Sequence, residues 1–527
     1  MTSKVVIAGK FGAKGEAELR QRGVAIVSCA GTDRVALQNA LRDADGLIVR
    51  SETRVDRSLL ENAPRLRVVG RAGAGVDAID VSAATAAGII VLNTPSANSI
   101  AVAEHTFALL LALMRRITEA NVSLRSGKWE RSRFIGNELF GKTLGIVSLG
   151  RIGGTVATRA QAFGMNVIAH DPYVPQSRVD TLGIELVALK ELLARADIVS
   201  LHAPLTAQTR GLIDGAALAM MQRHGVLVNC ARGEIIDEDA LLAALDDETI
   251  AGAALDVVAE EPPPAGSPSA RLHSHPKVLA TPHLGGSTRE AQDRIALELA
   301  RDLAEALSGR PAAGAVNAPA PSGADADRVR PFVALADRLG RLMPQLFESA
   351  ARGPLRLELG GEIAAAEPQS LAAALLAGLL QTTSERRISI VNALQIGAEL
   401  GIGLEIAADP HVQAFASQLA VCSGGHRIAG TVLHAGPRIV EIDGYELDVA
   451  PQGPWLVTHH DDVPGTVGRV GTILGDAGIN IATMQVARKE EESAALMVLA
   501  VDRAVDRENL ARIRELPGMR RVDAAVV

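Results

Sequence analysis

The segment TLGIVSLGRIGG, at residues 143–154, constrains the fold of this chain more than any other feature. An apolar run ends there in a glycine-containing turn, and a helical pattern follows it. Glycines let the backbone of such a turn approach a pyrophosphate, and the N-terminus of the helix offers amide donors and a positive dipole. Asp171 follows a second apolar run, where a carboxylate can accept hydrogen bonds from the ribose of NAD and would repel the extra phosphate of NADP. The pattern predicts a parallel α/β domain that binds NAD.

One position departs from the expected glycine pattern. Ser148 stands where the first glycine of a G-x-G-x-x-G turn is expected, so the turn has the form S-x-G-x-x-G. A serine fits there if its φ angle is negative, although its side chain crowds the turn. Gly150, Arg151, Ile152 and Gly153 all remain in place, so we keep the prediction of a nucleotide site. The alternative is a glycine turn that only packs a helix on a strand.

Short β-branched runs alternate with helical segments through the N-terminal part of the chain, which indicates parallel βαβ units. A single long helix is predicted over Ser99–Ser126. The proline-rich segment Glu260–Pro268 is predicted to be a loop, because proline lacks the N–H donor and fixes φ. The predicted strands are Lys4–Ala8, Ala25–Cys29, Gly46–Val49, Arg67–Val69, Ile89–Leu92, Thr143–Ser148, Asn166–His170, Ile198–Leu201, Val226–Asn229, Ala253–Asp256 and Val278–Ala280.

The chain is too long for a single core, and its composition suggests where the domains divide. PAAGAVNAPAPSGADAD, at residues 311–327, is rich in Pro, Ala and Gly and is predicted to be a linker. A β-α-β-β-α-β pattern near the C-terminus is typical of a ferredoxin-like domain. We expect an α/β protein with two Rossmann-like lobes, a substrate-binding lobe at 1–97 and 284–312, an NAD-binding domain at 98–283, an intervening α/β domain at 313–452 and a ferredoxin-like domain at 453–527.

The bulk composition excludes several classes of protein. A net charge of −8 and an aromatic content of 2% argue against a nucleic-acid-binding protein, which needs a basic face and stacking side chains. The three cysteines are far apart and match neither a disulfide framework nor a zinc site, so we expect no metal and a reducing compartment. There is no signal-peptide pattern, and the longest uncharged apolar stretch is about half the length of a bilayer span. We expect a cytoplasmic protein that binds neither nucleic acid nor a membrane.

Three residues of complementary chemistry follow predicted strands of the same domain. They are Arg232 in the segment NCARG, Glu261 before a run of prolines, and His283 in TPHLGGST. The carboxyl ends of strands in an open α/β sheet face the ligand crevice, so the three can converge. A histidine can take the hydroxyl proton of an alcohol near neutral pH, a neighbouring carboxylate fixes its tautomer, and an arginine binds a substrate carboxylate through two parallel donors.

A second set of residues in the N-terminal lobe can form an anion cradle. Arg50 and Arg71 each follow a predicted strand, and the amides around Gly73 and Ala74 lie close by in the sequence. Two guanidinium groups and backbone amides suit a phosphate or a carboxylate. The alternative is that these are ordinary surface arginines.

The segments RAGAGVD (71–77), NCARG (229–233) and TPHLGGST (281–288) closely resemble the D-isomer-specific 2-hydroxyacid dehydrogenases. Within that family the resemblance is strongest to the long-form phosphoglycerate dehydrogenases, and it covers essentially the whole chain. It implies that NAD is the cofactor, that D-3-phosphoglycerate is the substrate, and that the enzyme is a homo-oligomer, a dimer of dimers. It further implies that Arg232 binds and polarises the substrate carboxylate, that His283 is the acid-base, and that Glu261 pairs with His283.

The resemblance also implies the ligand contacts, residue by residue. Arg50 and Arg71 would hold the phosphate, Arg131 and Arg133 would reach the site of a partner subunit, and the substrate contacts would be Arg50, Ser51, Arg71, Gly73, Ala74 and Asn98. The cofactor contacts would be Gly150, Arg151, Ile152, Gly153, Asp171, His202, Pro204, Cys230, Ala231, Arg232, Asp256, His283, Gly285 and Gly286.

The C-terminal segments VTHHDDVPGTVG (457–468) and GINI (478–481) resemble an ACT domain, a small-molecule sensor. The resemblance implies control by L-serine, bound between paired domains near His460, Asp462 and Asn480. Such a domain can also serve assembly alone. In the intervening domain, which is expected to have an allosteric or assembly role, Arg427 and Arg438 are candidates for a second anion site.

Two rival functions remain open from the sequence. One is a dehydrogenase or reductase for another 2-hydroxy acid, of the glyoxylate or hydroxypyruvate type. The other is a non-catalytic protein that binds NAD as a sensor, which the presence of Arg232, Glu261 and His283 disfavours.

Overall fold

The structure is a computed structural model that describes residues 2–310, 312–319, 326–347, 353–384, 386–412, 414–489 and 493–527. The chain divides into two compact units. The first comprises Met1–Phe11, Glu16–Asn93 and Leu299–Val527, and the second comprises Gly12–Gly15 and Thr94–Glu298.

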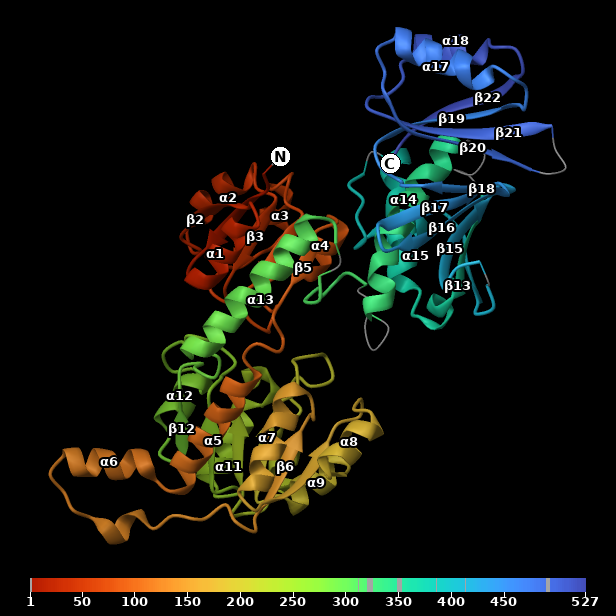
Figure 1. The fold of residues 1–527 in the computed structure, drawn as a ribbon. Helices are drawn as coiled ribbons and strands as arrows, with labels where there is room; N and C mark the ends of the chain where they lie inside the picture. The colour runs from red at the N-terminus through yellow and green to blue at the C-terminus, as the bar shows by residue number, and fades with distance from the viewer. Residues whose placement is uncertain are drawn as a thin grey trace. The chain divides into compact units, whose positions relative to one another are not determined.

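A five-stranded parallel sheet forms the N-terminal part of the first unit (Figure 1), in the order β2-β1-β3-β4-β5. Strand β3 (Gly46–Val49) is buried along its whole length, as expected of a parallel strand with both faces covered. The C-terminal half of helix α13 (Arg289–Leu307) covers one face, because an added Cβ at Gly70 would lie 2.9 Å from the Leu299 side chain. The other elements are β1 (Lys4–Ala8), β2 (Ala25–Cys29), β4 (Val68–Arg71), β5 (Ile90–Leu92), α1 (Ala13–Gln21), α2 (Arg34–Leu41), α3 (Arg57–Glu61) and α4 (Val81–Ala86).

Residues 312–319 of the segment predicted to be a linker lie on the edge of this sheet. Ala315 forms an isolated antiparallel bridge with Leu92, and the Asn317 side chain accepts a hydrogen bond of 2.8 Å from the Val91 amide. Residues 312–319 of the predicted linker are therefore held on the sheet, because an edge strand offers unpaired backbone groups that this segment satisfies. Residues 311 and 320–325 of the prediction lie outside the described part of the chain.

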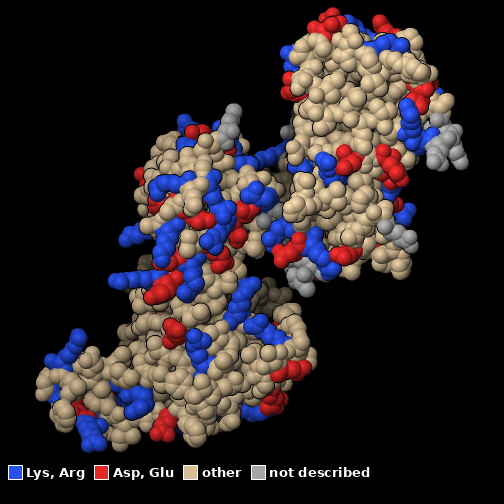
Figure 2. Space-filling view, in the orientation of Figure 1, with Lys and Arg blue, Asp and Glu red and all other residues tan. Residues whose placement is uncertain are grey.

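Charged residues on this part of the first unit are mixed in sign. Figure 2 shows basic and acidic side chains side by side over helices α1 and α13. Arg22 pairs with Glu18 and with Glu305, each at 3.0 Å. Such solvent-exposed pairs contribute little to stability, and they keep opposite charges interspersed on this face.

A seven-stranded parallel sheet forms the second unit, in the order β12-β11-β10-β9-β6-β7-β8. The order reverses at β6 (Thr143–Val147), which has β7 on one side and β9 on the other. Ligands bind at such a reversal, beyond the carboxyl ends of the strands. The other strands are β7 (Asn166–His170), β8 (Glu185–Leu186), β9 (Ile198–Leu201), β10 (Val226–Asn229), β11 (Gly252–Leu255) and β12 (Val278–Ala280), and the helices are α7 (Arg151–Ala162), α8 (Gln176–Leu182), α9 (Leu189–Arg195), α10 (Gly215–Met220), α11 (Glu238–Asp246), α12 (Pro268–Ser274) and η2 (Gly233–Ile235).

The predicted single helix over Ser99–Ser126 is two helices, α5 (Ser99–Met114) and α6 (Ile117–Arg125). The chain breaks at Arg116, whose φ of 52° lies in the left-handed region. Figure 1 shows α6 standing away from the sheet of the second unit as part of an arm, which returns through η1 (Arg131–Phe134). The predicted proline-rich loop is also present, although Pro268 begins helix α12.

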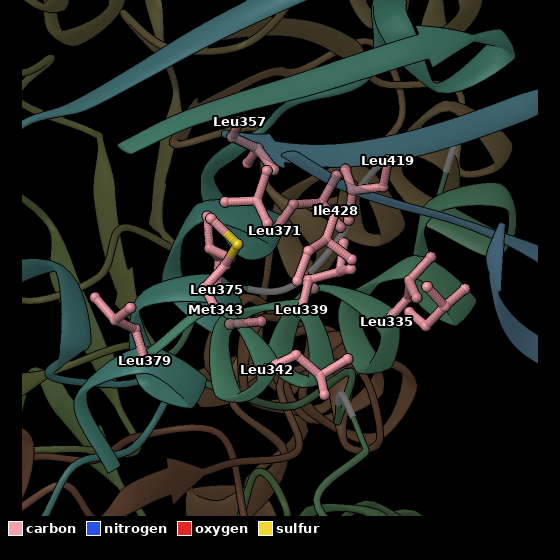
Figure 3. Packing of buried hydrophobic residues seen from close by; sticks show 14 of the residues in the cluster. Leu335, Leu339, Leu342, Met343, Leu357, Leu371, Leu375, Leu379, Leu419 and Ile428 are labelled. Carbon is pink, nitrogen blue, oxygen red and sulfur yellow. The ribbon is translucent and has the colours of Figure 1, made fainter. Parts of the chain in front are cut away.

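The intervening part of the first unit is a six-stranded sheet in the order β14-β13-β15-β16-β17-β18 with two long helices packed on it. Figure 3 shows the leucine-rich core that joins these helices to the sheet, including Leu339, Leu375 and Leu419. Gly340 allows the two helices to approach closely, since a Cβ there would lie 2.1 Å from the Leu375 carbonyl oxygen. The elements are α14 (Ala326–Leu346), β13 (Leu355–Gly361), η5 (Glu362–Ala365), α15 (Gln369–Thr383), α16 (Ala393–Glu399), β14 (Leu404–Asp409), β15 (Ser417–Ser423), β16 (His426–Leu433), β17 (Gly436–Ile442) and β18 (Tyr445–Val449).

The C-terminal part has the predicted β-α-β-β-α-β order. Its sheet, β20-β21-β19-β22, carries α17 and α18 on one face (Figure 1), and its other face contributes Trp455 and Val498 to the core of the intervening part. Within the described residues, no helix combines the length and the apolar character needed to cross a membrane. The elements are β19 (Pro454–Asp461), α17 (Thr466–Asp476), β20 (Ile481–Arg488), β21 (Ala494–Val501), α18 (Arg507–Arg514) and β22 (Met519–Val526).

Candidate functional site

The turn after β6 has the predicted strand-turn-helix geometry, and its first residue has an unfavourable backbone angle. Ser148 has a φ of 75°, so the condition under which a serine fits this turn without strain, a negative φ, is not met. Two contacts fix the turn: the Ser148 amide donates to the His170 carbonyl oxygen at 2.9 Å, and a Cβ on Gly153 would lie 2.1 Å from the Ser148 carbonyl oxygen. The close packing of α7 on this strand therefore requires glycine at residue 153.

The N-terminus of α7 is open to a ligand. Gly150 is exposed and precedes the helix with a φ of −67°, and an added Cβ there would meet nothing closer than the Ser148 hydroxyl oxygen at 3.9 Å. Arg151 and Ile152 form the first turn of the helix, where the amides lack partners within the helix. The open glycine surface and the helix amides together fit the pyrophosphate of a dinucleotide.

Asp171 lies directly after β7 and is turned toward the same loop. Its Oδ2 accepts hydrogen bonds from the Leu149 amide at 2.8 Å and from the Ser148 hydroxyl at 3.3 Å. Its Oδ1 accepts from the Tyr173 amide at 2.9 Å. The carboxylate is half-buried and is fixed beside the glycine turn, as the sequence predicted.

His202 and Pro204 follow β9, next to β6 in the sheet. The His202 amide donates to the Val147 carbonyl oxygen at 2.9 Å, and its Nε2 pairs with the Ser200 hydroxyl at 2.9 Å. Burial lowers the pKa of His202 to about 4, so the ring is neutral at pH 7. Within the described residues its buried Nδ1 has no hydrogen-bond partner, which fits a site that a ligand completes.

The loop that carries Arg232 is closed by Asn229 at the end of β10. The Asn229 side chain accepts from the Ala231 amide at 3.0 Å and donates to the Arg232 carbonyl oxygen at 2.9 Å. A Cβ on Gly233 would lie 1.9 Å from the Val258 carbonyl carbon, so this loop packs directly on the loop that leads to Glu261. Cys230 is buried in this loop, and burial raises the pKa of its thiol to about 12.

Glu261 and His283 form the pair that the sequence predicted. The His283 Nδ1–H donates to the Glu261 carboxylate at 2.7 Å, and the other carboxylate oxygen accepts from the Val258 amide at 3.2 Å. The donation at Nδ1 leaves Nε2 of the ring available for proton exchange. His283 has a φ of 52°, an unfavourable backbone conformation of the kind that occurs at active sites.

Asp256, at the end of β11, organises the loop that carries His283. Its side chain is 1% exposed and accepts hydrogen bonds from the Leu284 amide at 2.7 Å, the Gly285 amide at 2.8 Å and the Thr281 hydroxyl at 2.6 Å. Burial alone would raise the pKa of Asp256, but the side-chain and backbone hydrogen bonds lower it to about 2.

One residue of this network, His105, was not foreseen from the sequence. His105, on α5, has its Nε2 3.1 Å from the Asp256 carboxylate and 3.0 Å from the Thr281 hydroxyl oxygen. The signal that could have identified it is a single histidine inside the apolar helix segment AEHTFALLL. Such a histidine needs a polar partner, and the aspartates at strand ends are candidates.

Asn98 lies beside the glycines that follow His283. It precedes α5, and an added Cβ on Gly286 would lie 3.3 Å from the Asn98 side-chain nitrogen. The Gly285 position is similarly close to Asp256, at 3.0 Å from its Oδ2. Among the described residues, the buried Asn98 Oδ1 has no hydrogen-bond partner.

The predicted anion cradle belongs to the first unit. Arg71 ends β4, pairs in register with Val49, and so lies at the same sheet edge as Arg50. The Arg71 guanidinium donates to the Ala72 carbonyl oxygen at 2.6 Å and lies where a Cβ on Gly73 would be, 1.7 Å away. Ser51 and Ala74 lie in the two loops that leave this edge.

The predicted effector and second anion sites already carry internal ion pairs. Asp462 pairs with Arg488 at 2.8 Å, His460 is buried, and the Asn480 amide donates to Asp502 at 3.1 Å. In the intervening domain, the two candidate arginines are ion-paired with carboxylates, namely Arg427 with Glu358 and Glu441 and Arg438 with Asp448.

Three family models match successive parts of the chain. "D-isomer specific 2-hydroxyacid dehydrogenase, NAD binding domain" matches residues 107–285. "D-3-phosphoglycerate dehydrogenase intervening domain" matches residues 328–443, and "ACT domain" matches residues 455–518.

Curated relatives cover nearly the whole chain. D-3-phosphoglycerate dehydrogenase of Methanocaldococcus jannaschii is 42% identical over 504 residues, which is 94% of each protein. D-3-phosphoglycerate dehydrogenase of Bacillus subtilis is 40% identical over 485 residues, 91% of each protein. Among solved structures, D-lactate dehydrogenase from Aquifex aeolicus in complex with NAD and lactic acid matches with a TM-score of 0.53 and 27% identity, covering 58% of this chain and 96% of that one.

Proposed function

The chain belongs to the D-3-phosphoglycerate dehydrogenases, within the D-isomer specific 2-hydroxyacid dehydrogenase family, and from this premise we propose that it oxidises D-3-phosphoglycerate to 3-phosphooxypyruvate. NAD⁺ takes up the hydride and a proton is released, which is the first step of phosphorylated L-serine synthesis. The observation that carries this assignment is the 2.7 Å pair of His283 and Glu261 in an NAD-binding domain.

His283 is the acid-base in this proposal. Glu261 accepts from Nδ1 and so holds the ring in the tautomer whose Nε2 can take the hydroxyl proton of the substrate. The carboxylate also stabilises the imidazolium that results. Arg232 binds the substrate carboxylate and polarises the carbonyl that forms, since its loop is packed against the Glu261 loop through Gly233.

The nucleotide turn holds NAD. The amides at the start of α7 and the open surface of Gly150 bind the pyrophosphate, and Asp171 binds the ribose and disfavours the phosphate of NADP. The orphaned buried nitrogen of His202 supports a ligand at this position. The remaining cofactor contacts in this proposal are Ile152, Gly153, Pro204, Cys230, Ala231, Asp256, Gly285 and Gly286.

Arg50 and Arg71 make the enzyme specific for a phosphorylated substrate. Their position at one sheet edge supports joint binding of a dianion, with Ser51 beside them and the Gly73–Ala74 amides on the substrate carboxylate. Asn98 completes the substrate contacts, and its Oδ1, which has no hydrogen-bond partner among the described residues, supports this role.

The test is an NADH-formation assay with D-3-phosphoglycerate and with its unphosphorylated counterpart, D-glycerate. Arg71→Gln should raise the KM for phosphoglycerate by about 10- to 100-fold, the size of a lost charge-assisted hydrogen bond, and should change that for D-glycerate little. Equal turnover of both substrates by the wild type would favour the glyoxylate or hydroxypyruvate type of enzyme. Absence of NADH with every 2-hydroxy acid would favour a nucleotide sensor.

The ACT domain is proposed to bind L-serine at paired domains through His460, Asp462 and Asn480. Asp462 is held at the start of the loop by Arg488, which supports a prearranged carboxylate for an amino group. Added L-serine should lower the rate of the wild type, and Asp462→Ala should abolish both inhibition and heat of serine binding in calorimetry. A serine-insensitive wild type with no binding heat would leave the domain a role in assembly.

The arm of the second unit is proposed to pair with another copy of the chain. Trp129, Ile135 and Phe140 on the arm are 82%, 78% and 76% exposed, which is unusual for large apolar side chains that are close in sequence. Arg131 and Arg133 lie in the same segment and would reach the site of the partner. Trp129→Ser should lower the molar mass measured by light scattering, while an unchanged mass would exclude Trp129 from the interface.

We further propose that the protein is located in the cytoplasm. Cys29, Cys230 and Cys422 are all free thiols, which supports a reducing compartment. A fluorescent fusion that is confined to a membrane or to the cell exterior would contradict it.

A further inference from the structure

The proposed function gives no role to Ser148, the first residue of the nucleotide turn. Its φ of 75° is a left-handed conformation that is unfavourable for any residue with a Cβ. The backbone cannot relax, because the Ser148 amide is bound to the His170 carbonyl and its own carbonyl is packed against Gly153. A glycine would adopt this conformation without strain.

The hydroxyl of Ser148 acts on Asp171. A carboxylate offers about four acceptor positions on its two oxygens. Among the described residues, three donors occupy Asp171: the Leu149 amide, the Ser148 hydroxyl and the Tyr173 amide. One acceptor position remains for a ligand, whereas the adenosine ribose of NAD presents two hydroxyl donors.

We propose that Ser148 is a specificity-determining residue that weakens NAD(H) binding by occupying an acceptor position of Asp171 that the ribose diol would otherwise use. The proposal rests on the function proposed above, in which Asp171 binds the ribose. Without the hydroxyl, two acceptor positions would match the two ribose hydroxyls. Ser148 thereby sets nucleotide affinity and leaves the chemical step to His283, which lies on another loop.

Two substitutions separate the hydroxyl from the strain. Ser148→Ala removes the hydroxyl and keeps the Cβ, and Ser148→Gly removes both. Ser148→Ala should bind NADH about fivefold more tightly than the wild type, because one additional net hydrogen bond is worth about that factor. Binding is measured by titration calorimetry with NADH alone, without substrate.

NADPH is the diagnostic probe in the same titration. The ribose of NADPH carries a phosphate in place of one hydroxyl. It therefore has no second hydroxyl that could donate to the acceptor position of Asp171 that Ser148→Ala leaves free. The affinity for NADPH should therefore stay within about twofold, and the preference for NADH over NADPH should rise about fivefold. Ser148→Gly should show the same preference together with a higher Tm, since it also relieves the backbone strain.

Glu248→Gly is the matched control for strain. Glu248 is exposed, follows helix α11, and has a φ of 56°. Its replacement should raise the Tm as Ser148→Gly does but leave the affinity for both nucleotides unchanged.

An affinity for NADH that does not rise in either Ser148 variant overturns the proposal. An equal rise for NADH and NADPH also overturns it, because that result reports a relaxed loop and not a freed acceptor. If Ser148→Ala fails to fold, Ser148→Gly supplies the same comparison. If phosphoglycerate is not oxidised but the NADH preference rises as expected, the substrate assignment fails and the role of Ser148 stands.

Discussion

Two loops of the second unit, residues 148–153 and 281–286, are held in similar ways, but the aspartates that hold them differ in the number of hydrogen bonds that they accept. Each contains a non-glycine residue in the left-handed conformation, Ser148 in the first and His283 in the second. Each is held by an aspartate at the end of a neighbouring strand, which accepts hydrogen bonds from a loop hydroxyl and from one loop amide in the first case and two in the second. The difference lies in how completely the two carboxylates, Asp171 and Asp256, are satisfied.

Donors among the described residues occupy all of the about four acceptor positions of the Asp256 carboxylate, which we call saturated, but only three of those of Asp171. Asp256 is 1% exposed at its side chain and lies within hydrogen-bond distance of four donor groups, whereas Asp171 is half-buried and receives three. The four donors around Asp256 hold its loop, and the acceptor position left on Asp171 can accept a hydrogen bond from a ligand. The comparison indicates that the His283 loop is fixed by the protein, and that the nucleotide turn is completed by its ligand.

Among the variants that test this difference between the two loops, His283→Ala should have the largest effect. The loss of the acid-base should lower kcat by about 10²- to 10⁴-fold. The affinity for NADH should change by less than about twofold, because the pyrophosphate and ribose contacts lie on the other loop and the variant keeps Gly285 and Gly286. Steady-state kinetics and NADH calorimetry on one preparation check both values. A variant with wild-type kcat would remove His283 from the mechanism.

Gly153→Ala tests the nucleotide turn as a piece of structure. A Cβ there would lie 2.1 Å from a backbone oxygen, so the helix must shift, and we expect a loss of about 3 kcal/mol in the free energy of unfolding. Gly150→Ala is the matched control, because its Cβ would meet only the Ser148 hydroxyl at 3.9 Å. Urea unfolding should show a loss below about 1 kcal/mol for the control. Equal losses would mean that α7 does not pack as described.

Asp256→Asn tests whether the charge of the saturated carboxylate stabilises the fold. The pKa of Asp256 is lowered from 3.8 to about 2, so its contribution is complete above about pH 5 and is lost as the pH falls toward 2. We expect the wild type to be about 2 kcal/mol more stable than the variant at pH 7, and the difference to shrink below pH 4. Urea unfolding across this pH range checks it. A difference that stays constant down to pH 2 would contradict the assigned pKa.

The parallel strands could be predicted from the sequence because they are buried runs of apolar residues. Strands β1, β3 and β10 have the predicted bounds, at Lys4–Ala8, Gly46–Val49 and Val226–Asn229. The break between α5 and α6 was missed because no glycine or proline marks it, and the left-handed Arg116 is not visible in a periodicity. The ordering of residues 312–319 was missed because it depends on an open sheet edge far away in the sequence.

In the site, the convergence of Arg232, Glu261 and His283 was expected from one rule, that strand ends of a parallel sheet share an edge. The pairing of Glu261 with His283 was expected from the family resemblance. The backbone angle of Ser148 did not follow, because contacts with His170 and Gly153 impose it against the local preference. Nor did the saturation of Asp256, since counting its donors requires the positions of α5 and of the loop after β12. The chemical roles of the residues could be predicted from the sequence, whereas the number of hydrogen bonds that each carboxylate accepts could not.

His105→Ala should have the smallest effect. It removes one of the four donors to Asp256 and so makes that carboxylate comparable with Asp171. Three donors to Asp256 would remain, which is the occupancy of Asp171, so the loop should stay in place with a loss of about 1 kcal/mol in stability. The value of kcat should fall less than about tenfold, far less than in His283→Ala, because His105 positions the loop through Asp256 and does not exchange protons with the substrate. Glu104→Ala, at an exposed neighbouring position on α5, controls for changes in the helix itself. A His105 variant as inactive as His283→Ala would show that the carboxylate needs all of its donors to hold the acid-base, and that occupancy alone does not separate the two loops.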